Sequence, residues 1–207
     1  MSVKEIATKI NRLLEPRGFF RRGKAWNRKT QPLVDVIDLQ KSKAGDMVTI
    51  NAGVLDRDVS TMLEDRAPSD FVQQPMCTVG VRIGELVDGR DKWWQIDNAG
   101  VADEIADDIA TRVLPFLEKM HAREAMRQWL ISTNVIRRRY PPPIINLAIL
   151  ECFLGDAAKG CTLLTELQKT TLGAWRVRIA EVAARLRCTQ GNLIWEVGIV
   201  ARADAGH

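Results

Sequence analysis

The chain has 207 residues, a hydrophobic content of 46% and a formal net charge of +4 at pH 7. These values are ordinary for a globular protein with one large domain or two small ones. No run of about 18 apolar residues occurs, which argues against a transmembrane helix and against a membrane partner. The first residues mix charged with apolar side chains, so we expect no signal peptide and a cytoplasmic protein.

The charge is distributed unevenly along the chain. Residues 1–45 hold 11 Lys and Arg against 4 Asp and Glu (+7), residues 46–120 hold 7 against 15 (−8), and residues 121–207 hold 12 against 7 (+5). A nucleic-acid-binding protein needs its positive charge on one face. That function would therefore require the acidic middle to fold away from the basic face.

Cysteines and histidines restrict the chemistry further. The cysteines stand singly in apolar surroundings without a CxxC pair, so we expect reduced thiols at Cys77, Cys152, Cys161 and Cys188. His121 and His207 are the two histidines, which argues against a zinc site. We interpret His121, between two expected helices, as a solvated surface residue instead of a catalytic base. We predict no catalytic residue, no metal site and no cofactor.

Residues 3–15 carry apolar side chains at helical spacing and predict an amphipathic helix that Ser2 caps and Pro16 and Gly18 end. The following segment, GFFRRGKAWNRK over residues 18–29, interleaves aromatic with basic residues. Proteins that bind single-stranded nucleic acid use such a combination, because aromatic side chains stack on the bases and basic side chains contact the phosphates. A strand whose aromatic residues pack inward while its charges face water explains the same pattern, and we favour this interpretation.

Residues 33–55 predict a β-hairpin around which the rest of the chain is organised. Two apolar, β-branched runs are joined by a polar turn over residues 41–46. In the second run, apolar residues 48, 50, 52 and 54 alternate with residues 47, 49, 51 and 53, as in a strand with one buried face. Residues 76–83 alternate in the same way and predict a third strand.

If these strands share one antiparallel sheet, polar side chains collect on the face turned away from the core. They are Gln40, Thr49, Asn51, Thr78 and Arg82. An arginine among amides can bind a carboxylate or a phosphate through two hydrogen bonds. Pairing of this arginine with Asp35, Asp38 or Glu85 in a structural role is the alternative, and we regard it as the more common arrangement.

Lys41 and Ser42 adjoin this polar face and complete a candidate site for a small anionic ligand. Neighbours on a strand point in opposite directions, which disfavours a catalytic Ser–Lys pair. Residues 84–94 predict a turn-rich loop that ends in Trp93 and Trp94. We expect one of these tryptophans in the core and the other at the surface, where tryptophan is a usual interface anchor; a purely structural pair is the alternative.

The remainder is predicted to be mostly helical. Residues 56–75 predict a mobile crossing or lid with a short helix, and residues 101–120 an acidic amphipathic helix kinked at Pro115. Further helices are expected before Pro141–Pro143, over residues 144–154, over residues 157–167 and around residues 175–186, while residues 191–201 are ambiguous. The tract Arg137–Arg139 can contact phosphate or an acidic partner, although arginines in a last helical turn commonly serve the helix dipole.

These elements predict an α+β fold. It has an N-terminal helix, a small antiparallel sheet of three or more strands packed by helices, and an all-helical C-terminal part. We divide the chain into an α+β domain over residues 1–120 and a helical region over residues 121–207 that either stands alone or packs on the first as one unit.

Five segments occur in a characteristic order: GFFRRGKAW, VIDLQKS, VTINAGVL, CTVGVRIGEL and DKWW. This series resembles the bacterial family known as domain of unknown function 4304, over about residues 6–119. The resemblance implies Asn at the position of Asp38, so the ligand preference of this chain would differ if that Asn takes part in recognition. It implies no activity, because the family is uncharacterised.

We expect a non-enzymatic module that binds another bacterial protein, of which an inhibitor or an immunity protein is one version. The sequence contains no Gly-rich phosphate loop, nucleophile elbow or metal-ligand cluster, any of which would argue for an enzyme. The residues expected to bind are Gln40, Lys41, Ser42, Asn51, Arg82, Trp93 and Trp94. Nucleic-acid binding is the first alternative, through Arg21, Arg22, Lys24, Arg28, Lys29, Arg137, Arg138 and Arg139. An enzyme or binder of a small anionic ligand is the second, and no oligomeric state is predicted.

Overall fold

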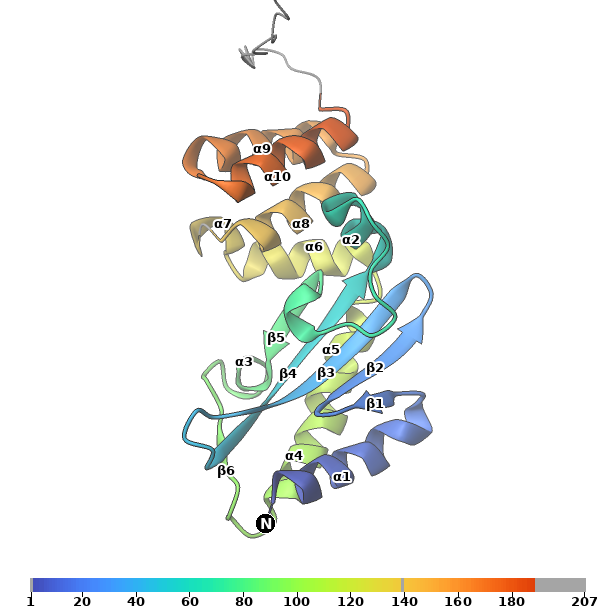
Figure 1. The fold of residues 1–207 in the computed structure, drawn as a ribbon, viewed down its shortest axis with the longest axis vertical. Coiled ribbons are helices and arrows are strands. Elements are labelled where there is room, and N and C mark those ends of the chain that lie inside the picture. The colour runs from blue at the N-terminus through green and yellow to red at the C-terminus, as the bar shows by residue number, and fades with distance from the viewer. Residues whose placement is uncertain (1, 139, 189–207) are drawn as a thin grey trace, which may run out of the picture.

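The computed structural model describes residues 2–138 and 140–188, and it confirms the predicted α+β class (Figure 1). The strands are β1 (Phe20–Arg22), β2 (Ala25–Thr30), β3 (Leu33–Lys41), β4 (Met47–Asp56), β5 (Val79–Arg82) and β6 (Trp94–Gln95). The helices of the first part are α1 (Val3–Leu14), α2 (Arg57–Glu64), α3 (Ile83–Val87), α4 (Val101–Asp108) and α5 (Leu114–Lys119). Those of the C-terminal part are α6 (Arg123–Ser132), α7 (Val135–Arg138), α8 (Pro141–Phe153), α9 (Ala157–Thr170) and α10 (Ala174–Arg185).

Helix α1 begins and ends where the sequence predicts. Ser2 accepts a hydrogen bond from the Glu5 backbone, and the Glu5 carboxylate accepts one from the Ser2 backbone, so two free N–H groups of the first turn are satisfied. After a short 3-10 turn (Glu15–Arg17), Gly18 takes a left-handed conformation that ends the helix. The apolar side of α1 is buried against the sheet and α4.

The sheet is antiparallel, with strand order β1-β2-β3-β4-β5, and β6 pairs with the beginning of β4. The predicted hairpin is its centre: Ile37 pairs with Ala52 and Leu39 with Ile50, and all four side chains are buried. Because paired residues share a face, these contacts define the core face. Helices α1, α4 and α5 cover this face, and α4 and α5 lie behind the sheet in Figure 1.

The third predicted strand is shorter than expected. It pairs with β4 over Val79–Arg82, and Ile83 already begins α3. Thr78 does not join the polar face, because its buried hydroxyl accepts a hydrogen bond from the Asp56 N–H. The backbone turns into α3 at Arg82, where the Glu85 carboxylate accepts from the Arg82 N–H.

Residues 65–78 cross the outer face of the sheet after α2. The Asn27 side chain exchanges two hydrogen bonds with the Val72 backbone, at 3.0 and 2.7 Å, and all these atoms are buried. Val72 also packs with Val34, Val36 and Leu55 in a small second core. Residues 65–78, which we call the cover segment, are therefore the predicted crossing and are joined to the sheet by these contacts, whereas their mobility stays a prediction.

The predicted helix over residues 101–120 is continuous but irregular. A π-helical turn (Ile109–Val113) separates α4 from α5, and the Leu114 N–H donates to the Ile109 carbonyl five residues earlier. Pro115 is the second residue after this turn and cannot donate a backbone hydrogen bond of its own. The irregularity thus lies immediately before the proline that predicted it.

The C-terminal helices form layers at one end of the sheet (Figure 1). Pro141–Pro143 begin α8 instead of ending the preceding helix, since proline is favoured in the first helical turn, where backbone N–H groups have no helical partner. Helix α8 is buried, Gly155 after it takes a left-handed conformation, and Asp156 caps α9. Residues 191–201 lie outside the described residues, and no helix among those described is long and apolar enough to cross a membrane.

Two of the four predicted free thiols are wrong. Cys161 of α9 and Cys188, just after α10, form a disulfide, while Cys77 and Cys152 are free. Two sulfurs 27 residues apart in sequence meet because α9 and α10 are antiparallel neighbours. Disulfides persist mainly in oxidising compartments, so the cytoplasmic location stays a prediction.

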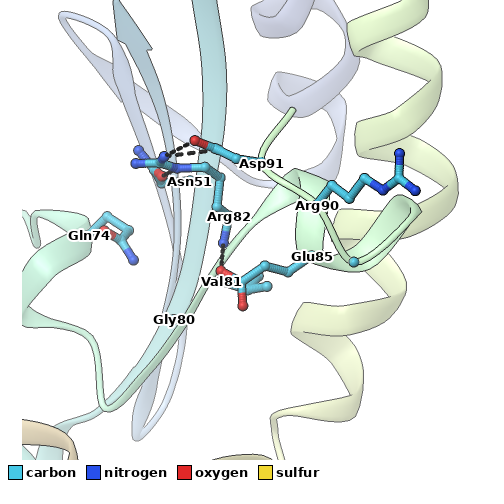
Figure 2. A pocket seen from close by; sticks show the side chains of 9 residues that line it. Asn51, Gln74, Gly80, Val81, Arg82, Glu85, Arg90 and Asp91 are labelled. Carbon is cyan, nitrogen blue, oxygen red and sulfur yellow. Dashed lines mark hydrogen bonds and ion pairs between the residues drawn. The ribbon is translucent and has the colours of Figure 1, made fainter. Parts of the chain in front are cut away.

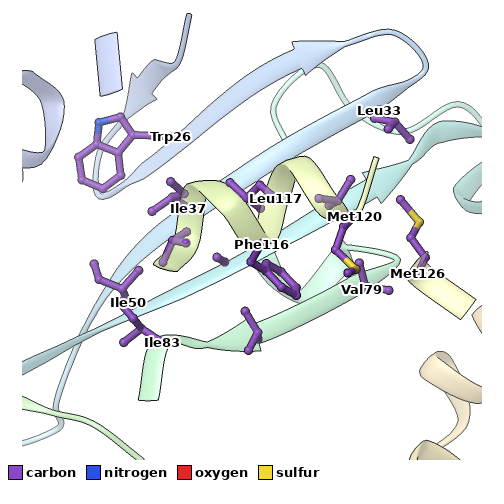
Figure 3. Packing of buried hydrophobic residues seen from close by; sticks show 14 of the residues in the cluster. Trp26, Leu33, Ile37, Ile50, Val79, Ile83, Phe116, Leu117, Met120 and Met126 are labelled. Carbon is purple, nitrogen blue, oxygen red and sulfur yellow. The ribbon is translucent and has the colours of Figure 1, made fainter. Parts of the chain in front are cut away.

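One hydrophobic core runs through both parts of the chain. Figure 3 shows Leu117 of α5 and Met120, which follows α5, packed against Ile37 and Val79 of the sheet, with Met126 of α6 beside them. The same cluster continues into α8, α9 and α10. The division into two domains, and the two alternatives given for the helical region, stay predictions.

Candidate functional site

A row of polar side chains crosses the outer face of the sheet. Asp38 of β3 pairs with Asn51 of β4, and Asn51 pairs with Arg82 of β5, so the three side chains point to the same face. Gln40 stands two residues beyond Asp38 on that face. All four side chains are half-buried. The register of three strands thus brings together residues that are more than 40 positions apart in sequence.

Arg82 is the centre of this cluster. Its Nε donates to Asn51 Oδ1 (3.3 Å), one terminal nitrogen donates to Gln40 Oε1 (3.3 Å), and the other contacts both carboxylate oxygens of Asp91 at 2.9 and 3.0 Å. Asn51 in turn donates to Gln40 at 2.8 Å. The alternative partners Asp35 and Asp38 are not used. The residues that accept from Arg82 on the sheet thus also bond to each other, and together with Asp91 they fix the orientation of the guanidinium.

Trp93 completes the cluster from the loop after α3. The Arg82 guanidinium lies 5.4 Å from the centre of the Trp93 ring, and the indole N–H donates to Asp91 at 3.0 Å. These two hydrogen bonds, from Trp93 and Arg82, lower the pKa of the Asp91 carboxyl. Trp94 points the other way, into the core, as strand alternation requires. One tryptophan in the core and one at the surface is therefore confirmed.

The loop that carries Asp91 and Trp93 is held by a close backbone approach. A Cβ atom on Gly84 would overlap the Arg90 carbonyl oxygen and lie 2.5 Å from the Lys92 nitrogen. Only glycine at position 84 lets the loop approach α3 so closely. Lys92 adds ion pairs to Glu104 (2.9 Å) and Asp108 (2.7 Å) of α4.

A hollow of about 360 Å³ adjoins the cluster (Figure 2). Gln74 lies on one side of it and Arg82 with Asp91 on the other, whereas the Arg90 side chain points away. A second hollow of about 190 Å³ continues past Gln74 and Gly80 to Trp129 of α6. The cluster therefore lies on an uneven surface that extends from the sheet to the helical layers.

Asp38 is the charged group of the row whose environment is most perturbed. Burial raises the pKa of its carboxyl, and a hydrogen bond from Asn51 and the charge of Lys24 only partly oppose this. A raised pKa means that the folded protein disfavours the charged form. The position at which the family resemblance implies Asn is thus part of the polar row.

Two predicted ligand-binding residues, Lys41 and Ser42, do not join the cluster, and neither does Thr49 of the predicted polar face. The Ser42 hydroxyl donates to Asp46 and accepts from the Gly45 and Met47 backbone, so it fixes the β3–β4 turn. Lys41 alternates with Gln40 on β3 and faces the opposite way. Thr49 is buried and donates to the Lys92 carbonyl at 2.7 Å.

The predicted basic cluster of the N-terminal part is largely engaged within the molecule. Arg28 pairs with the buried Asp35 at 2.7 Å and with Glu118, and Lys29 pairs with Asp70. The Arg21 and Arg22 guanidiniums lie 5.3 and 5.0 Å from the Trp26 and Phe71 ring centres. Of the three aromatic residues of this segment, Phe19 and Trp26 are buried as the favoured interpretation predicted, and Phe20 is partly exposed.

The second basic tract lies elsewhere. Arg137 and Arg138 belong to α7 at the helical end of the molecule, far from β1 in Figure 1, and Arg139 lies outside the described residues. The backbone of α7 therefore lies apart from β1 and β2. Lys24 is exposed at the β1–β2 turn.

His121 is not the solvated residue that its sequence context predicts. Its Nε2 lies 2.8 Å from Asp35 Oδ1, on a carboxylate that is fully buried and also holds Arg28. This cluster fastens the beginning of the helical part to the sheet. Among residues 2–138 and 140–188, no group of three His, Cys, Asp or Glu side chains is arranged to hold a metal ion.

The residue that sequence reasoning missed is Asp91. Its position in a polar loop gave no alternation to follow, although its spacing of two residues before Trp93 is a signal for such a contact.

Comparison with known proteins places this site within a family. Residues 10–119 match the family described as "Domain of unknown function (DUF4304)". The chain belongs to this family. The polar row, Asp91 and Trp93 all lie within the DUF4304 part, whereas α6–α10 follow it. Searches among curated proteins and among solved structures found no match.

Proposed function

We propose that this DUF4304 protein is a non-enzymatic module that binds another protein through the surface around Arg82 and Trp93. The observation that carries the proposal is the fixed Arg82–Trp93 stack beside a hollow. Arginine and tryptophan are the residues most enriched at the energetic centres of protein interfaces. Here both are held in place before any partner arrives, so little conformational entropy remains to be lost on binding.

The exposure of the cluster supports the same function. The Arg82 side chain is 32% exposed and that of Asp91 is 55% exposed, so their ion pair is a surface pair that contributes little to stability. An incoming hydrogen-bonding group can therefore take the place of Asp91 at small cost. Gln40 and Asn51 offer further amide groups beside it.

The chemistry of the neighbouring residues gives no support to an enzyme. The Ser42 hydroxyl is used in a turn, and burial raises the pKa of the Cys77 thiol, whereas a nucleophilic cysteine needs a lowered pKa. The surface around Arg82 has charges of both signs, from Arg82, Asp91 and Glu85. Such a surface suits a protein partner better than a phosphate backbone.

Affinity capture with matched variants tests the proposal. The tagged chain is expressed at native level in its source cells, captured with and without nuclease, and compared with Arg82→Ala and Trp93→Ala. We expect a stoichiometric protein partner that survives nuclease and that each variant retains at least about tenfold less, as for interface anchors. Trp175→Ala is the control, because Trp175 is 37% exposed on α10, outside the DUF4304 part.

Arg82→Lys separates loss of charge from loss of geometry, since lysine keeps the charge but lacks the planar fork. Circular dichroism of each variant verifies that it is folded. A partner that Arg82→Ala and Trp93→Ala both retain, or one that nuclease removes, would contradict the proposed function.

A further inference from the structure

The polar row extends across all five main strands. Arg22 of β1 pairs with Ala25 of β2, and Ala25 pairs with Asp38 of β3, which continues the row already traced to Arg82. Paired residues of antiparallel strands share a face. The outer face of the sheet therefore carries one cross-strand row with an arginine at each end.

The two ends are built alike. The Arg22 guanidinium lies 5.0 Å from the centre of the Phe71 ring, and that of Arg82 lies 5.4 Å from the Trp93 ring. Stacking on an aromatic ring restrains an arginine without using its hydrogen-bond donors. Arg22 is exposed and has no ion pair among the described residues. Arg82 has one, with the half-exposed Asp91.

The middle of the row holds one small side chain and two hydrogen-bonding side chains. Ala25 has the smallest side chain of the five and is buried, and Asp38 and Asn51 follow it as hydrogen-bonding groups. The cover segment borders the row at both ends, with Phe71 beside Arg22 and Gln74 at the hollow beside Arg82. A ligand that spans the row therefore meets cations at its ends and hydrogen-bonding groups at its centre.

The dimensions of the row define the ligand. Strands are about 4.8 Å apart, so four intervals place the Arg22 and Arg82 backbones about 19 Å apart. An extended peptide rises about 3.3 Å per residue and covers that distance with about six residues. Charge complementarity places a carboxylate at each end and a neutral segment between them, whose backbone N–H groups can donate to Asp38.

We propose that the partner of this module presents an extended acidic segment that lies across the five strands, with two carboxylates about six residues apart on Arg22 and Arg82. The inference rests on the proposed function, because it places the partner on the Arg82 surface, and adds Arg22 as a second contact. Two charge-assisted hydrogen-bonding ends fix the position of the segment across the strands.

Single-stranded nucleic acid fits the same row less well. It requires aromatic faces free for stacking, but the described contacts place Arg22 over Phe71 and Arg82 over Trp93. Asp38 also puts a carboxylate at the centre, where it repels phosphate.

A displayed library of random 12-residue peptides tests the inference. It is selected in parallel on the wild-type chain, Arg22→Gln, Arg82→Gln and Arg112→Gln. The last is the matched control, because Arg112 is exposed on the π-helical turn between α4 and α5, which cover the opposite face of the sheet. Selection on the wild type and on the control is expected to enrich peptides with two acidic residues about six positions apart. Selection on Arg22→Gln or Arg82→Gln is expected to enrich peptides with one acidic position. A synthetic copy of an enriched peptide should bind either end variant about tenfold more weakly, as expected for loss of one charged hydrogen-bond partner.

The outcomes separate this inference from the proposed function. If Arg82→Gln weakens binding and Arg22→Gln does not, the peptide does not span the row, and the inference fails while the Arg82 surface stands. If the selected peptides lack the acidic pair, or neither variant changes their affinity, the inference fails, and capture with Trp93→Ala decides the proposed function separately. An eight-nucleotide thymidine oligonucleotide that competes with the peptide and depends on both arginines would assign the row to nucleic acid and overturn the inference.

Discussion

Asp38 links the polar row to the pH dependence of stability. Burial raises the pKa of its carboxyl above the ordinary value of 3.8. The folded chain therefore binds this proton more tightly than the unfolded chain does, and ionisation of Asp38 destabilises the fold. The penalty is absent below the unfolded pKa and grows as the pH rises through the folded pKa.

Asp38→Asn should therefore stabilise the protein at pH 7, because asparagine occupies the same space without a charge. The gain should disappear at about pH 3, where the wild-type carboxyl is protonated in both states. Urea unfolding at pH 7 and at about pH 3 measures this gain in the free energy of unfolding. Asp97→Asn, at an exposed position outside the row, is the control for the loss of one charge. A variant that is less stable than wild type at pH 7 would show that the Lys24–Asp38 attraction outweighs the burial.

Gly84 tests whether the site depends on the position of its loop. In Gly84→Ala the new methyl group would overlap the Arg90 carbonyl, so the loop that carries Asp91 and Trp93 must move. We expect a loss of about 1–3 kcal/mol in the free energy of unfolding, typical of overpacking, and reduced capture of the partner. Gly100→Ala is the comparison: it strains a left-handed residue outside the hollow but meets no atom within 4 Å, so it should keep the partner. Equal capture by both variants would mean that the loop position does not matter.

The candidate site was partly predictable at this scale. Alternation along β4 and β5 identified Asn51 and Arg82 as neighbours on one face, because period two is a property of the strand itself. Which of Trp93 and Trp94 turns outward depends on the pairing of β6 with β4, which is a long-range contact. His121 lacked any such pattern, and its buried partner Asp35 is 86 residues away.

At the scale of elements, Gly160 controls the approach of α8 and α9. A Cβ at this position would overlap Cys152 Sγ and lie 2.5 Å from the Ala148 carbonyl oxygen. In an isolated helix Gly→Ala would be favourable by about 1 kcal/mol. In this crossing we expect the opposite sign, because the backbone of α8 cannot move without opening the core.

The measurement is the urea midpoint of Gly160→Ala against that of Thr162→Ala. Thr162 is exposed in the same helix, so its replacement tests helix propensity without the close approach and should raise the midpoint slightly. Gly160→Ala should lower it, by about 1–3 kcal/mol in free energy. An increase in both variants would show that the helices are not in close contact.

Elements were predicted best where the signal is local. The cap at Ser2, the end of α1 at Gly18 and the alternation in β4 each depend on a few neighbouring residues. Pro141–Pro143 were assigned to the wrong side of a helix boundary, because proline both ends one helix and begins the next. The Cys161–Cys188 disulfide was missed, since it requires the pairing of α9 with α10.

At the scale of the whole molecule, the parts that the sequence divides are joined by two buried carboxylates, that of Asp35, which contacts His121, and that of Asp56. Asp56, at the end of β4, caps α2 and binds Arg123 at 2.6 and 3.2 Å. Arg123 also pairs with Asp58, and its guanidinium lies 4.9 Å from the Phe153 ring centre in α8. One side chain thus contacts the sheet, α2 and the helical layers. Since the hydrophobic core is also continuous across this boundary, the two parts should unfold together.

Native-state hydrogen exchange can measure this coupling. The slowest amides of β3 and of α8 should report the same opening free energy, because neither core can open without exposing the other. Arg123→Ala leaves Asp56 buried without its cation, and we expect it to lower both values equally, by about 2–4 kcal/mol. Arg112→Ala, which removes an exposed arginine away from the junction, should change neither. If Arg123→Ala lowered the stability of α8 and left β3 unchanged, residues 1–120 would be an independent domain, and the helical layers would be an attachment to it.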